Sequence, residues 1–503
     1  MSAIEGSSSP DRRFLGQPRM LANLAGVELW ERFSFYGMLS ILLIYLCYGA
    51  ARGGLGIDQS TATSIVGAYG GLVYLATIAG AWLADRVFGA ERVLFGSAVL
   101  VMCGHLTLAA LPGTPGLAAG LSLVAVGAGG VKATATTLVG SLYGPDDARR
   151  DAGFTIFYLG INLGGVTGAL LTGLVQNEAG FRWGFGLAAA GMAIGLTQYA
   201  RGRRRMTDRA REVPSPLPTQ QRTLVFTCAA AAVLTIVTLA VSGMIPARRL
   251  SLIVVAFCIL ATVASFVVIL SSRRISRIER RRVIAFIPLF AASAAFCSLY
   301  QQQFTVVAIY SDRRLDRDLF GWEMPVSWVL ALNPVFVIAL AGLFAGLWTW
   351  LGPRQPSAPV KFALGLIVMG VAFLLFLPFA GTVAVPLLGL VGIMLVFTVA
   401  ELLIQPVGLS VSARLAPAPF RTRMVALFFL SVALGTAMSG VLSGYYREEH
   451  EAAYFGILGL TAVILGAALW AAGPAIRRMS ESHDRADRSR RELPGAPVPA
   501  QRR

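Results

Sequence analysis

Long apolar runs separated by short polar segments make up most of the chain. A run of about 20 apolar residues forms an α-helix long enough to cross the hydrocarbon core of a bilayer, which is about 30 Å thick. Six such runs come first, two follow after a polar break, and six more follow a second break. The pattern therefore predicts an all-α membrane protein with fourteen transmembrane helices, at 21–48, 61–83, 92–111, 116–143, 153–175, 183–200, 223–244, 250–270, 283–311, 326–350, 360–380, 384–412, 421–445 and 452–471.

Two basic segments divide the predicted helices into groups of six, two and six. The first, "ARGRRRMTDRAREVPSPLPTQQR", is also rich in proline, and the second is "SSRRISRIERRR". Because neither is apolar enough to enter the bilayer, both are expected to be loops. The chain therefore divides into an N-terminal six-helix bundle (1–200), basic linkers with two accessory helices (201–282), a C-terminal six-helix bundle (283–475) and a polar tail expected to be disordered and cytoplasmic (476–503).

The two groups of six helices carry an internal repeat. The segment "GAWLADRVFGAER" (80–92) joins the second and third predicted helices, and "LFAGLWTWLGPR" (343–354) joins the corresponding helices of the second group. In this register Gly89 matches Gly352, while the second copy lacks the charges of the first. Two related halves with a site between them are typical of secondary transporters.

Composition supports a membrane location and excludes a soluble domain. The 503 residues are 56% hydrophobic and 14% charged, whereas soluble proteins have about 25% charged residues. The net charge of +17 would fit a nucleic-acid partner, but most of the excess Lys and Arg lies in short loops and the tails, so we expect no nucleic-acid binding. The same bias orients membrane proteins, and it predicts a multi-pass protein of the inner (plasma) cell membrane with both termini in the cytoplasm.

Three charged residues interrupt the first predicted helix. Glu28, Glu31 and Arg32, in "VELWERF", are spaced i, i+3 and i+4, so they share one helical face. A charge in hydrocarbon costs about 2.5–3.5 kcal/mol on insertion scales, so we interpret this face as the wall of a water-filled cavity. The alternative is a structural ion pair between Glu28 and Arg32 that neutralises itself for insertion.

A lysine and a glutamate lie deep in other predicted helices. Lys132, in "VGAGGVKATATTLVG", is one of two lysines in a chain that otherwise uses arginine. Lysine can lose its proton when it is desolvated, whereas arginine cannot, which favours a titratable role over a lysine that snorkels to the membrane surface. Glu401, in "FTVAELLIQPVGLS", is a lone carboxylate in a helix that Pro406 is expected to break, and such a residue is a functional candidate. Asn162 and Asn333 add neutral hydrogen-bonding groups, whose alternative role is to join helices.

No enzyme motif is readable in the sequence. The chain lacks a Walker A loop, a GxSxG elbow and an HExxH helix, and its three histidines have no zinc-binding spacing. A membrane-embedded enzyme would need a reactive cluster at the membrane face, and none is readable. We therefore expect a protein that is not an enzyme, with no catalytic residue, no cofactor and no metal site. No segment is long enough to form a nucleotide-binding domain, so an ion gradient or a solute gradient would supply the energy.

Several motifs along nearly the whole chain resemble those of proton-dependent oligopeptide transporters, a branch of the major facilitator superfamily. The segment "ELWERFSFYGM" is similar to the family's ExxERFxYYG signature, "GAWLADRVFGAERVL" to its GGxxADRxxG loop, and "FTIFYLGINLGG" to its FYxxINxG helix. The segments "GAGGVKATATTLVGSLY", "SWVLALNPVF" and "ELLIQPVGLSVSARLAP" resemble its fourth, eighth and tenth core helices. The resemblance implies a major facilitator fold of two six-helix bundles. Bacterial members carry two extra helices between them, which fits the six-two-six pattern.

The resemblance also implies roles for individual residues. The residues of proton coupling would be Glu28, Glu31, Arg32 and Lys132. The substrate-binding residues would be Tyr36, Tyr69, Asn162, Gln301, Asn333, Glu401 and Phe428. Among these, Glu401 would hold the amino terminus of a peptide. The residues of gating and conformational change, in the loop motif, would be Asp85 and Arg86.

The sequence departs from the family pattern at the expected peptide site. Leu39 stands where the family usually has an arginine that commonly meets the peptide carboxylate, and Gln301 replaces a glutamate. Phe428 replaces a tryptophan. Because Gln301 carries no charge, Lys132 loses its expected carboxylate partner and could itself titrate. These losses predict a pocket that is more apolar and less suited to zwitterions, in which Glu401 still provides a site for a cation.

The resemblance implies a proton-coupled symporter that imports di- and tripeptides by alternating access of its two halves around a midplane site. The expected partners are a small peptide or peptide-like substrate, protons and the lipid bilayer. The alternative keeps the fold and changes the cargo to a non-peptide or peptide-like amine-bearing metabolite with altered proton coupling.

Overall fold

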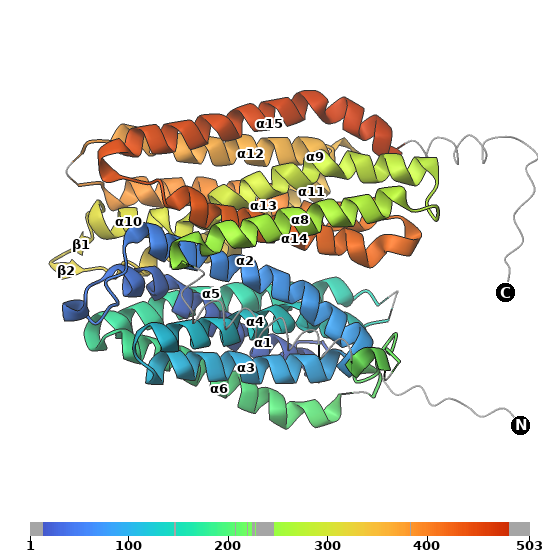
Figure 1. The fold of residues 1–503 in the computed structure, drawn as a ribbon, viewed down its shortest axis with the longest axis horizontal. Coiled ribbons are helices and arrows are strands. Elements are labelled where there is room, and N and C mark those ends of the chain that lie inside the picture. The colour runs from blue at the N-terminus through green and yellow to red at the C-terminus, as the bar shows by residue number, and fades with distance from the viewer. Residues whose placement is uncertain are drawn as a thin grey trace, which may run out of the picture.

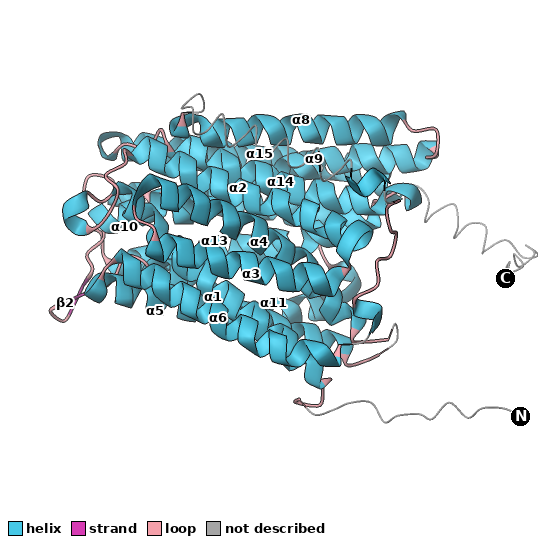
Figure 2. Cartoon of the chain, turned by 60° about the horizontal axis from the view of Figure 1, so that its bottom comes forward, coloured by secondary structure: helices cyan, strands magenta, loops and turns pink. Residues whose placement is uncertain are grey.

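The chain folds into a bundle of long helices that lie side by side with their axes roughly parallel (Figure 1). The structure, a computed structural model, describes residues 14–481 except 145–146, 207, 219, 224–226, 228–245 and 383. Figure 2 shows loops joining the helices at two opposite ends of the bundle.

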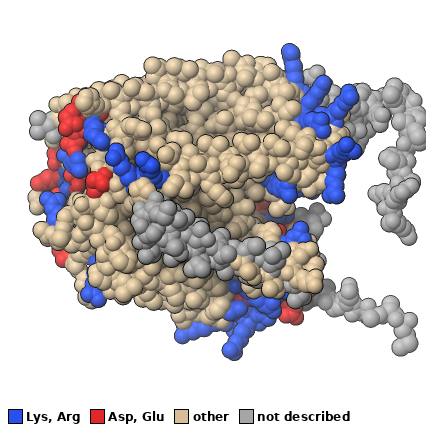
Figure 3. All heavy atoms as spheres, in the orientation of Figure 1, with Lys and Arg blue, Asp and Glu red and all other residues tan. Residues whose placement is uncertain are grey.

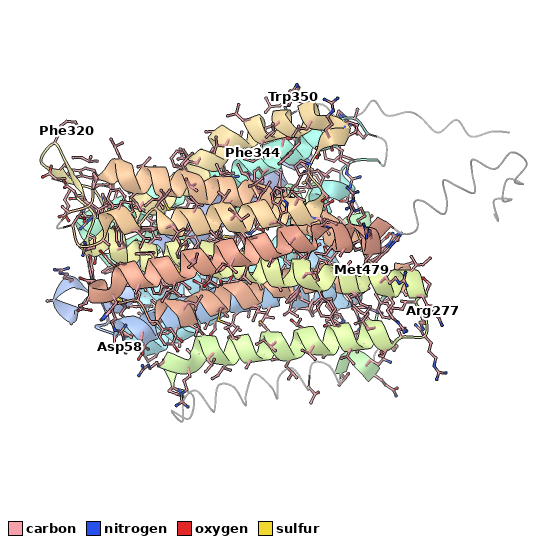
Figure 4. The ribbon with its side chains drawn as sticks, turned by 90° about the horizontal axis from the view of Figure 1, so that it is seen from above. Asp58, Arg277, Phe320, Phe344, Trp350 and Met479 are labelled. Carbon is pink, nitrogen blue, oxygen red and sulfur yellow. The ribbon has the colours of Figure 1, made fainter. Side chains whose placement is uncertain are left out.

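The two ends of the bundle are distinguished by what they carry. One end holds an antiparallel hairpin of two short strands, β1 (Asp318–Leu319) and β2 (Trp322–Glu323), and is called the hairpin end below. The first helix, α1 (Arg19–Cys47), begins at the opposite end, and the last helix, α15 (Glu451–Glu481), ends there. This opposite end is called the termini end. Figure 4 shows Phe320 and Asp58 at the hairpin end.

The N-terminal half contains six long helices. They are α1, α2 (Gln59–Leu83), α3 (Ala90–Ala110), α4 (Gly113–Ser141), α5 (Arg150–Ala179) and α6 (Phe181–Gly202). Helix α1 packs against α5 and α6, while α3 packs against α4 and α6, and α2 packs against α4. All six predicted spans of this half therefore form helices that pack as one bundle.

The C-terminal half contains six spans, the first of which is interrupted. They are α9 (Arg277–Tyr300) with the 3-10 turn η6 (Gln301–Phe304) and α10 (Val306–Arg313), then α11 (Trp328–Leu351), α12 (Ala358–Leu374), α13 (Leu387–Arg414), α14 (Arg421–Ser443) and α15. Helix α12 packs against α13 and α15, and α14 packs against α9 and α13. The second half repeats the six-span plan of the first.

One accessory helix, α8 (Leu250–Ser271), packs against α2 of the first half and α14 of the second. The other predicted accessory span, 223–244, falls largely outside the described residues. Short helical turns lie in the connections: η1 (Ala50–Arg52), η2 (Ala84–Phe88), η3 (Arg203–Arg205), η4 (Asp208–Ala210), η5 (Ala247–Arg249), η7 (Gly352–Arg354), η8 (Leu377–Phe379), η9 (Ala418–Phe420) and η10 (Glu448–His450).

The last helix is longer than its apolar run. Helix α15 continues to Glu481, so residues 476–481, for which the sequence predicts a disordered tail, are helical. Helix α9 likewise begins at Arg277, inside the second basic segment, where Ser276 and Glu279 form a capping box. Hydropathy identifies only the part of a helix that lies in lipid, whereas backbone hydrogen bonds allow the helix to continue beyond the lipid into water. Residues 482–503 lie outside the described residues.

The helices have the length and composition of membrane spans. Among the described residues, twelve helical segments are long and apolar enough to cross a membrane. Helix α6, with 22 residues, is not one of these twelve, and with the predicted span 223–244 it brings the total to the fourteen expected. Figure 3 shows a broad middle band without charged side chains on the visible face; Lys and Arg predominate at the termini end, and Asp and Glu gather at the hairpin end.

Hydrogen bonds join the two halves near the hairpin end. The Tyr48 hydroxyl donates to Asp312 Oδ1 at 2.5 Å. Gln59 Nε2 donates to the Tyr446 carbonyl at 3.1 Å, and Trp328 Nε1 donates to the Leu170 carbonyl at 3.0 Å. The structure therefore holds the halves together at the end where the hairpin lies.

Two glycines bring the backbones of the halves into direct contact at the same end. A Cβ added to Gly67 of α2 would lie 2.5 Å from the Gly440 Cα of α14. Only glycine permits such an approach, because a methyl group on either residue would displace the opposite helix. The accessory helix α8 is fixed beside this contact, since Ser251 Oγ donates to the Ser64 carbonyl at 2.7 Å.

Candidate functional site

A cavity of about 240 Å³ lies between the two halves. The N-terminal half contributes side chains and glycines from α1, α2, α4 and α5, namely Arg32, Phe35, Tyr36, Leu39, Val66, Gly67, Gly70, Val73, Tyr74, Lys132 and Tyr158. The C-terminal half contributes α9, η6, α13, α14 and the residue after η6, namely Tyr300, Gln301, Phe304, Thr305, Glu401, Gln405, Thr436 and Ser439. Charged and aromatic groups from both halves therefore meet in one central chamber.

The predicted charged face of α1 is buried behind this cavity. Glu28, Glu31 and Arg32 have 3%, 0% and 5% of their surface exposed. Arg32 Nε donates to Glu28 Oε1 at 2.9 Å and lies 3.0 Å from Glu31 Oε2. Arg32 also lines the cavity, with its guanidinium 5.5 Å from the centroid of the Phe35 ring. One guanidinium thus lies between two carboxylates on one face of the helix.

Glu31 is the less well satisfied of the two carboxylates. Neither of its oxygens has a hydrogen-bond donor, whereas Glu28 Oε1 accepts the bond from Arg32. Burying an ionised carboxylate without donors is costly, so a proton is the simplest means of satisfying Glu31. Glu31 is therefore the carboxylate of this face with the least compensation for its burial.

Lys132 enters the cavity from α4. Its Nζ lies 4.1 Å from the centroid of the Tyr74 ring, and Lys132 has no ion pair with any described residue. The glycines before it allow close helix packing: a Cβ on Gly129 would lie 2.5 Å from Ala76 Cβ, and one on Gly130 would lie 2.0 Å from Ser97 Oγ. These contacts fix the rotation of α4 and direct the lysine toward the central chamber.

Glu401 faces the cavity from the opposite half. Asn333 Nδ2 donates to Glu401 Oε2 at 3.0 Å and also lies 3.1 Å from Thr398 Oγ1. The Tyr300 hydroxyl donates to Asn333 Oδ1 at 3.2 Å, which orients the amide so that its nitrogen points at the carboxylate. Asn333 is itself buried, so it holds Glu401 from behind without lining the cavity.

Gln301 lines the cavity close to where the first span of the second half is interrupted. Its Nε2 donates to Thr436 Oγ1 at 3.1 Å. The amide is therefore fixed by α14 and provides a neutral wall to the chamber, as expected from its lack of charge. Leu39 also lines the cavity and adds an apolar surface at the position where the family commonly has arginine.

Besides Asn333, three of the predicted substrate residues lie behind the wall in this structure. The buried Tyr69 stacks on Phe35, with ring centroids 6.2 Å apart. Asn162 Nδ2 donates to the Tyr158 carbonyl at 2.9 Å, so it supports a residue that does line the chamber. Phe428 packs against the backbone of α13, where a Cβ on Gly408 would lie 2.3 Å from its ring. Tyr36 lines the cavity directly.

Several residues that line the cavity are not predicted from the sequence. The aromatic ones are Tyr74, Tyr158, Tyr300 and Phe304. A signal was available for two of the missed residues, Gln405 and Tyr158. Gln405 follows Glu401 by four residues and therefore shares its helical face. Tyr158 likewise precedes Asn162 by four residues. For Tyr74 the sequence carries no such signal, because its direction depends on how α2 packs.

The predicted gating residues lie outside the central chamber, on the turn η2 at the termini end. The Ser215 amide donates to the Asp85 carbonyl at 3.0 Å, and Arg86 Nη1 donates to the Ser215 carbonyl at 3.4 Å. The first basic linker is thus bonded to this turn. Gly89 and the matching Gly352 both have positive φ angles, +83° and +47°, as expected for two copies of one loop.

Two helical halves that enclose a central cavity with buried charges define this protein as a secondary transporter. The sequence matches the model of the POT family over residues 91–458. The chain belongs to the POT family, the proton-dependent oligopeptide transporters whose motifs it resembles.

Relatives match the chain over nearly its whole length. The uncharacterized transporter YclF of Bacillus subtilis (strain 168) is 38% identical over 475 residues, which cover 94% of this chain and 96% of that protein. A di-/tripeptide transporter of Lactococcus lactis subsp. cremoris is 36% identical over 479 residues, which cover 92% and 96%. The similarity therefore extends across both halves.

Solved structures share the fold. The peptide transporter POT in complex with sulfate has a TM-score of 0.90 and 40% identity, over 93% of this chain and 97% of that one. A POT family transporter in complex with 5-aminolevulinic acid has a TM-score of 0.88 and 31% identity, over 93% and 98%. These matches confirm the predicted major facilitator fold with its plan of fourteen helices.

Proposed function

We propose that this chain is a proton-coupled symporter that imports di- and tripeptides by alternating access of its two halves. The observation that carries the proposal is the central chamber, where Arg32 and Lys132 from one half face Glu401 from the other. A peptide has a charged amine and a charged carboxylate, so a chamber with both signs of charge offers each end a partner. The names of two di-/tripeptide transporters at 36% and 37% identity support the same cargo.

Within this proposal, the two ends of the substrate have different partners. Glu401, oriented by Asn333, would bind the amino terminus. The carboxylate would meet Arg32, Lys132 or neutral donors, because Leu39 supplies no charge. Tyr36, Tyr69, Asn162, Gln301 and Phe428 would shape the site, either at its wall or directly behind it.

The proton would be carried by the group on α1 and α4. Glu31 has no hydrogen-bond donor, so it would take up a proton when the chamber is open to the side of higher acidity. Glu28 would compete for Arg32, and Lys132 on α4 would respond to the charge of Glu31 on α1. Proton uptake would then change which charges are paired, and this change would favour one orientation of the halves over the other.

The moving parts and their orientation also form part of the proposal. Residues 1–200 and 283–475 would be the two bundles, with 201–282 connecting them, and Asp85 and Arg86 would act at the termini end during the exchange. The basic segments at the termini end favour a cytoplasmic location for both termini, so that this end would face the cytoplasm. The closed hairpin end would then face the outside, so this structure would represent a state closed to external substrate.

The test is uptake of labelled dialanine by the purified protein in proteoliposomes. With an imposed pH gradient, acidic outside, dialanine should accumulate above its external concentration, and a protonophore should abolish the accumulation. Liposomes with equal pH on both sides provide the matched control. Uptake that only equilibrates dialanine under every condition would contradict proton coupling.

The alternative cargo, a non-peptide amine-bearing metabolite, is less well supported by the relatives. One structure in the family was solved with 5-aminolevulinic acid. Parallel uptake of labelled 5-aminolevulinic acid therefore separates the two proposals. Transport of this compound without any transport of dialanine would favour the alternative.

A further inference from the structure

A second, larger hollow lies on the outer surface of the N-terminal half and shares no lining residue with the central chamber. It has a volume of about 1070 Å³ and runs between the start of α1 and the end of α6, and we call it the α1–α6 groove. Its charged and polar lining residues are Arg19, Asn23, Thr197, Gln198, Arg201 and Arg205. No described residue that lines it is acidic. The groove is therefore a basic site at the termini end.

The floor of the α1–α6 groove is held in place by hydrogen bonds in both directions. Asn23 Nδ2 of α1 donates to the Tyr199 carbonyl of α6 at 3.4 Å. Gln198 Nε2 of α6 donates to the Ala22 carbonyl of α1 at 3.3 Å. These two bonds fix the spacing of the helices, so the groove exists before any ligand arrives.

Arg201 and Arg205, at the mouth of the groove, differ from the nearby Arg203 in lacking an acidic partner among the described residues. Arg203 is neutralised by the buried Glu91, with its Nε 2.6 Å from Glu91 Oε1. Arg201 and Arg205 line the groove, are exposed, and have no ion pair with any described residue. The groove thus presents two positive charges, Arg201 and Arg205, that have no acidic partner among the described residues, whereas Arg203 between them is paired with Glu91.

The exposed side of α6 changes in character along its length. Trp183, 66% exposed, lies near the hairpin end, Ile194, 51% exposed, lies further along, and Thr197 and Arg201 follow toward the termini end. This is the pattern of a helix face that contacts lipid, with tryptophan at one interface, an aliphatic surface in the middle and arginine at the other interface. Ile194 also lines the groove, so its apolar wall leads directly to its basic mouth.

We propose that the α1–α6 groove binds an anionic phospholipid. The phosphate lies at Arg201 and Arg205, with Arg19 opposite, and an acyl chain lies along Ile194. The polar groups between them, Asn23 and Thr197, lie at the depth of the glycerol ester. Basic pockets between helices on the cytoplasmic side are known to suit such headgroups, and here the acyl path continues from the same pocket.

Occupancy of this groove would act on α1, the helix that bears the buried charges. Glu28 follows Asn23 by five residues, which is about 7.5 Å along a helix. A lipid that bridges α1 and α6 would therefore stiffen the helix that positions Arg32. The binding itself does not depend on the identity of the transported substrate.

The test is native mass spectrometry of the detergent-purified full chain, titrated with phosphatidylglycerol and, in parallel, with phosphatidylcholine. One phosphatidylglycerol should bind more tightly than the rest, and phosphatidylcholine should lack this site. Each basic side chain contributes about fivefold to binding of an anionic lipid, so the double variant Arg201→Gln/Arg205→Gln should weaken the tight site about 25-fold. The matched control, Arg273→Gln/Arg274→Gln, removes two exposed arginines elsewhere and should leave the site unchanged.

A second variant tests whether the lipid occupies the groove, without altering charge. Thr197→Trp fills the groove and should reduce phosphatidylglycerol binding, whether or not the arginine variant folds. Soluble glycerol 3-phosphate should not compete, because it lacks the acyl chain. The proposal is wrong if glycerol 3-phosphate displaces the lipid or if both arginine pairs have equal effects. It is also wrong if lipid binds only after residues 1–13 are deleted, because the N-terminal segment would then be the natural occupant of the groove.

Discussion

Glu31 is the residue whose burial is least compensated at the proposed proton site. It is fully buried, and it shares Arg32 with Glu28, which takes the hydrogen bond. We predict that Glu31→Gln folds and inserts, because glutamine has a shape similar to that of glutamate and removes a buried charge. Dialanine accumulation driven by a pH gradient should fall to a ratio of about one, while exchange of dialanine across the membrane persists.

The measurement for Glu31→Gln is the ratio of internal to external dialanine in proteoliposomes. Glu178→Gln is the matched control, since Glu178 is exposed at the end of α5 and should not affect accumulation. Normal accumulation by Glu31→Gln would remove Glu31 from proton coupling and leave its charge a structural one.

Lys132 differs from Arg32, the other cation that lines the chamber, in the chemistry of its side chain. Lysine loses its charge when desolvated, whereas arginine keeps it. In the described structure Lys132 contacts the Tyr74 ring and has no ion pair, so no carboxylate partner favours its protonated form. We predict that Lys132→Arg abolishes gradient-driven accumulation, measured as above. Lys361→Arg, at the start of α12, provides the control. If Lys132→Arg accumulates dialanine normally, a fixed positive charge is sufficient there.

Within the proposed function, Leu39 would limit how strongly the carboxylate end of a substrate is bound. A bidentate arginine bond to a carboxylate contributes about 1.5–3 kcal/mol, and leucine cannot supply it. Glu401, by contrast, is oriented by Asn333 and would bind the substrate amine under the proposed function. We therefore predict that N-acetylation of a dipeptide nearly abolishes competition for uptake, whereas C-amidation weakens it only slightly.

The converse variant checks the same reasoning. Leu39→Arg should restore preference for the free carboxylate by about tenfold or more, seen as a difference in inhibition constants between a dipeptide and its amide. Stronger sensitivity to C-amidation than to N-acetylation in the unaltered protein would contradict this view of the two ends.

At the scale of elements, a clasp joins the end of α6 to the start of α3. Glu91 in the first turn of α3 has no exposed surface, and Arg203 of η3 binds it with two bonds, of 2.6 and 3.1 Å. Arg211 of the linker approaches the same carboxylate at 3.7 Å. The clasp therefore fixes the first basic linker against the loop that bears the gating residues.

We predict that Glu91→Gln destabilises this part of the protein by about 1.5–3 kcal/mol, because it leaves Arg203 without its charged partner. The midpoint of thermal unfolding in detergent should fall. Glu212→Gln, an exposed residue of the same linker, is the control and should leave the midpoint unchanged. Equal midpoints for both variants would show that the clasp adds no stability.

At the scale of the whole molecule, Gly67 and Gly440 allow the two halves to close at the hairpin end. A methyl group at this contact would overpack it, at a cost of about 1–3 kcal/mol. We predict that Gly67→Ala shifts the protein away from the closed state and lengthens the distance between spin labels on Arg52 and Glu449, two exposed residues of opposite halves. Gly186→Ala, where nothing lies within 4 Å, is the control. An unchanged distance would show that the contact does not limit closure.

The sequence by itself determined the features that depend on local pattern. Apolar run lengths specify membrane helices, because the bilayer requires about 20 residues per span, and basic segments specify where the halves divide. The spacing of Glu28, Glu31 and Arg32 places them on one face regardless of what surrounds them. Motifs identified the family. Each of these depends on residues that are close in sequence.

Tertiary structure alone decided which side chains line the chamber and which support it. The rotation of a helix is set by the helices that pack on it, as Gly129 against Ala76 shows, so Tyr74 faces the cavity while the buried Tyr69 lies behind. The pairing of Glu91 with Arg203 joins residues that are 112 positions apart. The α1–α6 groove likewise exists only because two distant helix ends meet. No local pattern encodes such contacts, since they arise from packing between helices whose faces are all largely apolar.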